Sequence, residues 1–265
     1  MLTLLLIPVF LYLALLVLVF ALQTKMLFPA GSAGGGASAP ASAERLAFNT
    51  PDGHRLAGTH FPAAFGSGPR TLVLGFGGNA WNADTAAAYL HTLFPEADVV
   101  VFHYRGYRPS TGTPSAAALA ADAPLVYDHA VAHLRPARVV AVGFSIGTGV
   151  AASLAPKRPL DGVILVTPFD SLTEVAAGQF PWLPVRWLFR HPMPAADWLR
   201  AANVPTALIA AERDILIRPE RTAALRAAVP NLAYDRTIPG VGHNDIYDAP
   251  AFRASMREAI ARLGG

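Results

Sequence analysis

The side chain best placed to do chemistry in this sequence is that of Ser145. It lies in the segment Gly143-Phe-Ser-Ile-Gly147, which fits the pattern G-x-S-x-G and overlaps the end of the apolar run 138–144. Between a buried strand and a helix of small residues, this pattern is typical of a nucleophile elbow, a tight turn that exposes a serine hydroxyl above a sheet. We therefore predict that Ser145 is a nucleophile. An ordinary Gly/Ser turn is the alternative interpretation.

A serine hydroxyl is a weak nucleophile at neutral pH, so it needs a base to take its proton and a carboxylate to orient that base. His243 lies in a glycine-rich loop after the last predicted strand, and Asp214 follows another apolar strand. Residues that follow parallel strands can converge at one edge of a sheet. We predict His243 as the base and Asp214 as the acid. Two further carboxylates close to strand ends remain alternative acids: Asp170 and Glu212.

Acyl transfer through a serine creates a negatively charged oxygen that needs hydrogen-bond donors. The backbone N–H of Ile146 is one predicted donor, because it follows the nucleophile at the start of a helix. The second predicted donor is the backbone N–H of Asn79, in the loop Gly77-Gly78-Asn79 that follows the third strand. A glycine turn with no electrostatic role is the alternative.

Strands and helices alternate along most of the chain, which predicts a mostly parallel sheet covered by helices on both faces. The first two strands flank a Pro-Asp-Gly turn and should form a hairpin. The final helix is expected at about 249–263, and another at 116–134. The predicted strands are 44–50, 55–61, 71–75, 98–104, 138–144, 162–166, 206–211 and 233–238.

Residues 2–22 form an almost continuous apolar run. A helix of this length spans roughly 30 Å, the thickness of the hydrocarbon core of a bilayer. We predict a transmembrane anchor over residues 1–23. A cleaved signal peptide is the main alternative, since residues 39–43 offer a small-residue cleavage site, and a buried soluble helix is another. Lys25 slightly favours a cytoplasmic catalytic domain, but one lysine leaves the side of the membrane open.

The remaining chain is predicted to have two parts. Residues 24–43 are rich in Gly, Ala and Ser and should form a flexible tether. Residues 44–265 form the predicted catalytic domain, with a small cap inserted at 169–200. Five large apolar side chains in this insert either roof an acyl site or pack short helices against the core: Trp182, Trp187, Leu188, Phe189 and Trp198.

Charge and composition exclude several classes of function. The net charge is +3, and the basic residues are scattered without a run, so nucleic-acid binding is not predicted. The chain has no cysteine, which excludes disulfides, a thiol nucleophile and thiolate metal sites. A serine nucleophile with a histidine base requires neither metal nor cofactor, and none is predicted. The oligomeric state is left open.

Further motifs accompany the elbow in a fixed order: Pro51-Asp-Gly53, Gly78-Asn79-Ala80, Tyr104-Arg-Gly-Tyr107 and Gly242-His243-Asn244-Asp245. In this order they resemble the membrane-anchored branch of the α/β-hydrolases that includes the bud-emergence homologue proteins and the depalmitoylating α/β-hydrolase-domain proteins. The resemblance implies an α/β-hydrolase fold with a short helical cap. It also implies that Ser145, His243 and Asp214 act together on an ester, thioester or amide bond. Gly77 departs from the family pattern, which usually has histidine there.

These observations predict a membrane-tethered serine hydrolase that forms an acyl-enzyme, with an esterase or thioesterase favoured over a peptidase. Its expected partners are an acyl-ester, thioester or peptide substrate and membrane lipid. An acyltransferase that uses the same triad is one alternative. A catalytically silent, membrane-anchored binding protein is another.

Overall fold

The computed structural model describes residues 2–31, 43–65 and 70–263. Its centre is an eight-stranded sheet with the strand order β1-β2-β4-β3-β5-β6-β7-β8. Both pairings of β2 are antiparallel, and the other five pairings are parallel. The strands are β1 (Glu44–Asn49), β2 (Arg55–Phe61), β3 (Thr71–Phe76), β4 (Asp98–Phe102), β5 (Arg138–Phe144), β6 (Gly162–Val166), β7 (Thr206–Ala211) and β8 (Leu232–Ile238).

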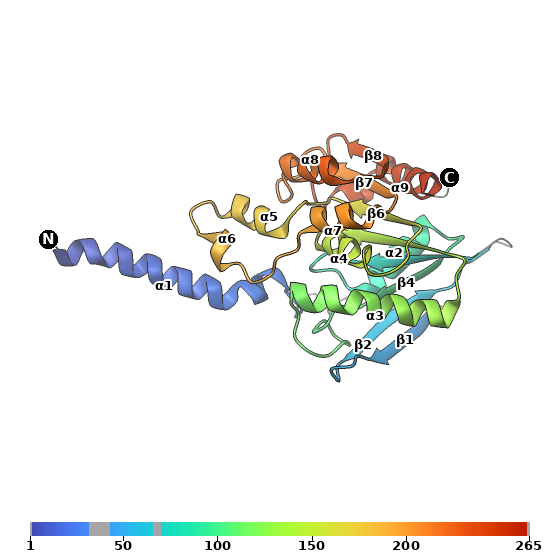
Figure 1. Ribbon diagram of the computed structural model, residues 1–265, viewed down its shortest axis with the longest axis horizontal. Coiled ribbons are helices and arrows are strands. Elements are labelled where there is room, and N and C mark those ends of the chain that lie inside the picture. Colours follow the sequence, from blue (N-terminus) through green and yellow to red (C-terminus); the bar gives the residue numbers. More distant parts are fainter. Residues whose placement is uncertain (1, 32–42, 66–69, 264–265) are drawn as a thin grey trace.

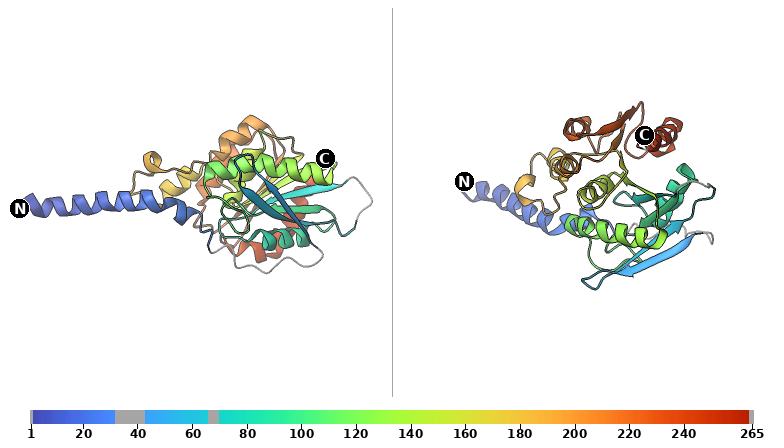
Figure 2. Two further views of the ribbon diagram at one scale, coloured as in Figure 1. Left: turned by 90° about the horizontal axis from the view of Figure 1, so that it is seen from below. Right: turned by 45° about the vertical axis from the view of Figure 1, so that its right-hand side comes forward.

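The predicted mostly parallel sheet, covered on both faces, is confirmed. Along β3, Leu72 and Leu74 pack on one face while Val73 packs on the other, so alternate side chains fill two separate cores. Burial on both faces explains why the central strands are continuous apolar runs. Helices α2 (Ala83–Leu93) and α9 (Pro250–Arg262) cover one face. The other is covered by α3 (Ala116–Leu134), α4 (Ile146–Leu154), α7 (Ala195–Ala202) and α8 (Pro219–Ala228) (Figures 1 and 2).

Helix α1 (Leu2–Leu27) projects away from this body (Figure 1). Residues Leu6–Leu27 have a mean hydropathy of 2.6 and are long and apolar enough to cross a membrane. A signal sequence would have the same properties. The first residues of the predicted tether, 24–27, are helical, and Phe28 is buried in the core. The rest of the tether, 32–42, lies outside the described residues.

The predicted cap lies between β6 and β7. It contains two short helices, α5 (Leu172–Gln179) and α6 (Val185–Leu188), and ends in α7. These short helices lie beside α1. The loop between them is joined to α1 by a hydrogen bond of 2.8 Å from the Tyr12 hydroxyl to the Trp182 carbonyl. The large apolar side chains of this cap differ in their surroundings. Phe189 and Trp198 pack against the core, whereas Trp182 and Trp187 are exposed.

Candidate active site

The elbow at Ser145 is a strained turn that only glycine neighbours permit. Ser145 has φ 52° and ψ −119°, a backbone conformation that residues with a side chain rarely adopt. A Cβ atom on Gly147 would lie 2.1 Å from the Phe76 carbonyl oxygen. A Cβ atom on Gly143 would lie 2.4 Å from the carbonyl oxygen of Gly147. Both glycines are therefore required sterically, and together they let β5 and α4 cross closely enough to expose the hydroxyl.

The structure brings Ser145, His243 and Asp214 together, although they come from three separate loops. The Ser145 Oγ lies 2.9 Å from His243 Nε2, and His243 Nδ1 lies 2.7 Å from Asp214 Oδ2. With Nδ1 protonated, the imidazole donates to the carboxylate and accepts the proton of the serine hydroxyl. His243 and Asp214 are only 8% and 5% exposed, so this chain of hydrogen bonds is shielded from water.

Backbone amides orient Asp214. Its Oδ1 accepts hydrogen bonds from the N–H groups of Leu216, at 2.9 Å, and Ile217, at 2.8 Å. Because these donors occupy one carboxylate oxygen, the other remains directed at His243.

The two alternative acids point elsewhere. Asp170 Oδ2 lies 3.2 Å from the Arg221 guanidinium, and burial raises the pKa of the Asp170 carboxyl. Glu212 accepts the backbone N–H of Gly240 at 2.7 Å. Neither makes a hydrogen bond to His243, so the geometry favours Asp214 as its carboxylate partner.

The predicted oxyanion donors lie on two segments in direct backbone contact. The close approach of Gly147 to the Phe76 carbonyl, and to that of Gly77, places the elbow helix against the loop that carries Asn79. Within the described part of the chain, the backbone N–H groups of Ile146 and Asn79 have no hydrogen-bond partner. Both donors are therefore available for an incoming oxygen.

Two tyrosines of the motif 104–107, for which the sequence predicted no individual role, hold the Asn79 loop in place. The Tyr104 hydroxyl donates to the Gly77 carbonyl at 2.8 Å, and the Tyr107 hydroxyl donates to the Asn79 carbonyl at 2.7 Å. Burial raises the pKa of both phenols, so they stay protonated as donors. The sequence signal was present: two tyrosines three residues apart, directly after β4. A Cβ atom on Gly77 would come no closer than 3.3 Å to Trp81, so this position does not strictly require glycine.

A separate group of side chains could hold a metal ion. Potential ligand atoms of Glu44, His60 and His133 lie within 4.8 Å of one another. The Nε2 of His60 lies 2.9 Å from Asp98, at the start of β4. This group is at the amino edge of the parallel strands, opposite the edge that carries Ser145. Its members already hydrogen-bond to one another, because Glu44 contacts both histidines at 3.0 Å.

Comparison with known proteins gives the same fold. A family model described as alpha/beta hydrolase fold matches residues 72–192. An uncharacterised protein of Mycobacterium tuberculosis, Rv2307c, is 38% identical over 201 residues, which are 74% of this chain and 70% of that protein. The chain belongs to the α/β-hydrolase family. The expected resemblance to this family is thereby confirmed.

More distant relatives of this α/β-hydrolase include lipases. Lysophosphatidylserine lipase ABHD12 of Danio rerio is 33% identical over 105 residues, 38% of this chain and 26% of that protein. Among solved structures, an alpha-beta hydrolase from Vibrio vulnificus superposes with a TM-score of 0.71 at 17% identity, covering 91% of this chain and 92% of that one. This structural likeness establishes the fold, and the lipase relatives support hydrolase activity.

Proposed function

We propose that this protein is a membrane-tethered serine hydrolase that cleaves an acyl ester or thioester through Ser145, His243 and Asp214. The observation that carries the proposal is the unbroken hydrogen-bond chain from a buried carboxylate, through an imidazole, to a hydroxyl on a strained elbow. A serine without such partners is not activated at neutral pH. Amide bonds are a less favoured substrate class.

In the proposed reaction, His243 Nε2 takes the Ser145 proton as Oγ attacks the acyl carbonyl carbon. The carbonyl oxygen becomes an oxyanion that accepts hydrogen bonds from the N–H groups of Ile146 and Asn79. Asp214 stabilises the imidazolium. When the intermediate collapses, His243 returns the proton to the departing alcohol or thiol, leaving an acyl-enzyme. Water then attacks with His243 again as base, which releases the acid and restores the serine hydroxyl.

The proposed membrane tether is α1. Its length and mean hydropathy suit an anchor or a signal sequence equally. Two contacts favour an anchor that is retained. Phe28 is 3% exposed within the core that also contains Leu46 and Leu56, and Thr24 Oγ1 lies 2.8 Å from His191 Nε2. Cleavage at 39–43 would remove both. The retained anchor predicts a full-length protein that resists carbonate extraction from membranes. A shortened, soluble product would contradict it.

The decisive test is Ser145→Ala in the full-length protein. We expect a loss of kcat on the order of 10⁶ on p-nitrophenyl esters, and no labelling by a fluorophosphonate probe, because the attacking oxygen is gone. Ser153→Ala is a matched control, since its hydroxyl lies on the same helix but bonds only to the Val150 carbonyl. Labelling that persists in Ser145→Ala would overturn the proposal. Product analysis with added alcohols would separate hydrolysis from acyl transfer.

A further inference from the structure

An apolar groove of about 260 Å³ lies between α1 and the cap. Its cap wall is formed within residues 172–189. Among the described residues that line it, only two glutamines have polar side chains, and both direct their amides at backbone. Gln23 Nε2 donates to the Leu188 carbonyl at 3.2 Å, and Gln179 Nε2 donates to the Ile215 carbonyl at 2.9 Å. The surface left inside the groove is hydrocarbon. The α1 wall consists of Leu16, Val19, Phe20, Gln23, Met26 and Leu27.

Specific contacts fix the two walls relative to each other. The backbone N–H of Arg190 donates to Gln23 Oε1 at 2.8 Å, and the Arg190 guanidinium lies 5.3 Å from the centre of the Phe20 ring. Farther along α1, Tyr12 bonds to the Trp182 carbonyl. A groove held at both ends in this way is a preformed site.

The position of these contacts along α1 determines how far into a bilayer the groove would extend. From Tyr12 to Leu27 a helix rises roughly 22 Å, most of the thickness of a hydrocarbon core. If Leu6–Leu27 crosses a membrane, the cap tip that contacts Tyr12 must enter the hydrocarbon core beside α1. The cap tip is suited to this, because Phe180, Trp182 and Trp187 are 39%, 53% and 88% exposed.

The inner end of the groove reaches the loop that bears the predicted oxyanion donor. Leu27 lines the groove, and its carbonyl accepts a hydrogen bond of 3.4 Å from Asn79 Nδ2. On the cap side, Leu172 also lines the groove and follows the segment that leaves the carboxyl end of β6. Ser145 N–H bonds to Val166 at that same strand end. The inner end of the groove therefore adjoins segments that contact the elbow or carry Asn79.

We propose that this groove binds the acyl chain of a membrane lipid ester, which enters sideways from the leaflet without passing through water. This inference rests on the proposed function and adds to it the substrate class and the route of entry. An acyl chain matches the all-hydrocarbon lining, and the wall formed by α1 is the part of the chain that meets lipid. Entry from the leaflet also avoids the cost of moving an acyl chain through water.

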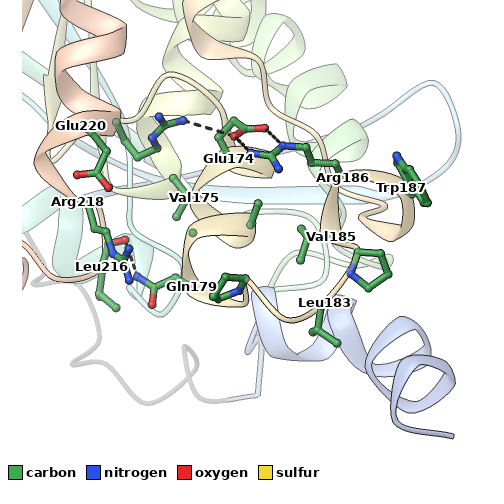
Figure 3. A pocket seen from close by; sticks show the side chains of 15 residues that line it. Glu174, Val175, Gln179, Leu183, Val185, Arg186, Trp187, Leu216, Arg218 and Glu220 are labelled. Atoms are coloured by element: carbon green, nitrogen blue, oxygen red, sulfur yellow. Dashed lines mark hydrogen bonds and ion pairs between the residues drawn. The ribbon is translucent and has the colours of Figure 1, made fainter. Parts of the chain in front are cut away.

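A second hollow, of about 510 Å³, adjoins the groove and shares Val175 and Gln179 of α5 with it. Unlike the groove, its lining includes charged side chains (Figure 3). Glu174 forms a two-point ion pair with Arg186, at 2.7 and 2.8 Å, and lies 3.8 Å from Arg221. These charged side chains distinguish the hollow from the groove, whose lining has none among the described residues. Two neighbouring residues of α5 still differ: Ala176 lines only the groove, and Ala177 lines only the hollow.

This pair gives a matched test in the full-length, detergent-solubilised protein. Ala176→Phe should fill the groove, and Ala177→Phe adds the same bulk in the hollow. The readout is the ratio of kcat/KM for p-nitrophenyl palmitate to that for p-nitrophenyl butyrate. We expect Ala176→Phe to lower this ratio about tenfold, and Ala177→Phe to change it less than twofold. Equal ratios in the two variants would overturn the inference.

A binding experiment separates failure of the groove from failure of the proposed chemistry. Ser145→Ala, in phosphatidylcholine vesicles, is irradiated with a phosphatidylcholine probe that carries a diazirine on its acyl chain. We expect crosslinks within 172–179, on the inner wall, and their loss when Ala176→Phe is added. Crosslinks confined to α1, or links between two protein copies in place of lipid, would overturn the groove proposal even if Ser145 proves to be the nucleophile.

Discussion

Two buried histidine–aspartate pairs lie at opposite edges of the same sheet. At the carboxyl edge His243 Nδ1 lies 2.7 Å from Asp214, and at the amino edge His60 Nε2 lies 2.9 Å from Asp98. All four residues are less than 9% exposed. The pairs differ in what surrounds them, and only one of them adjoins a hydroxyl, that of Ser145.

The surroundings determine what each imidazole can do. The other nitrogen of His60 lies 3.0 Å from the Glu44 carboxylate, and the Arg70 guanidinium bonds to Asp98 at 2.6 and 2.8 Å. These charged partners occupy the remaining hydrogen-bonding positions of His60 and Asp98. Asp214, in contrast, is held by neutral backbone amides, and His243 keeps a free lone pair for the serine proton. A histidine–aspartate pair becomes catalytic only when a weak acid, such as a serine hydroxyl, lies next to the imidazole nitrogen that does not face the aspartate.

The largest expected difference between the pairs is in turnover. Asp214→Asn should lower kcat about 10⁴-fold, because an amide no longer holds the imidazole in the tautomer that accepts the serine proton. Asp98→Asn should change kcat less than threefold in protein that remains folded. Both are measured on p-nitrophenyl butyrate. Similar losses in the two variants would remove the functional distinction between the edges.

The second prediction tests the steric crowding at the elbow, on the carboxyl edge. Gly147→Ala would place a methyl group 2.1 Å from the Phe76 carbonyl oxygen, so we expect the free energy of unfolding to fall by about 3 kcal/mol. Gly178→Ala, in α5, is the control. It meets nothing within 4 Å and should raise the free energy of unfolding by about 0.5–1 kcal/mol. Denaturant unfolding followed by circular dichroism measures both, and equal stability of the two variants would contradict the expectation.

At the amino edge the expected effect is on stability and its dependence on pH. Burial raises the pKa of Asp98, but the hydrogen bonds from His60 and Arg70 outweigh it, and the net shift is downward. The ionised carboxylate therefore stabilises the fold above the unfolded pKa of about 3.9, and this contribution is lost as the pH falls through the lower folded value. Asp98→Asn should cost about 3 kcal/mol at pH 7. Thermal unfolding from pH 7 to pH 3 should show the gap to wild type narrowing; a constant gap would exclude an ionic origin.

The smallest effect is expected at Glu44. Its side chain is 47% exposed, so Glu44→Gln should change the free energy of unfolding by less than about 1 kcal/mol. Activity should not change, because the proposed reaction takes place at the opposite edge. Denaturant unfolding and ester hydrolysis provide the measurements. A large loss in either would mean that this edge has a role beyond structure.

Much of the fold was predictable because its signals are local. The apolar runs gave β2, β5, β6 and β7 at the ends that the structure has, while β4 ends at Phe102 rather than Tyr104. There the chain turns into a loop that delivers Tyr104 to Gly77. Helix α8 was not predicted, because it lacks a clear apolar face: only Thr222 and Leu225 are buried.

The sequence by itself determined the elbow and the apolar helix, since each depends on neighbouring residues: glycines two positions from Ser145, and an apolar run long enough to span a bilayer. Only the tertiary structure decided which carboxylate meets His243, which tyrosines hold the Asn79 loop, and that α1 lies along the cap. The Tyr12–Trp182 contact joins residues 170 positions apart. The physical reason is that such contacts depend on how separate segments pack, and no local pattern encodes that arrangement.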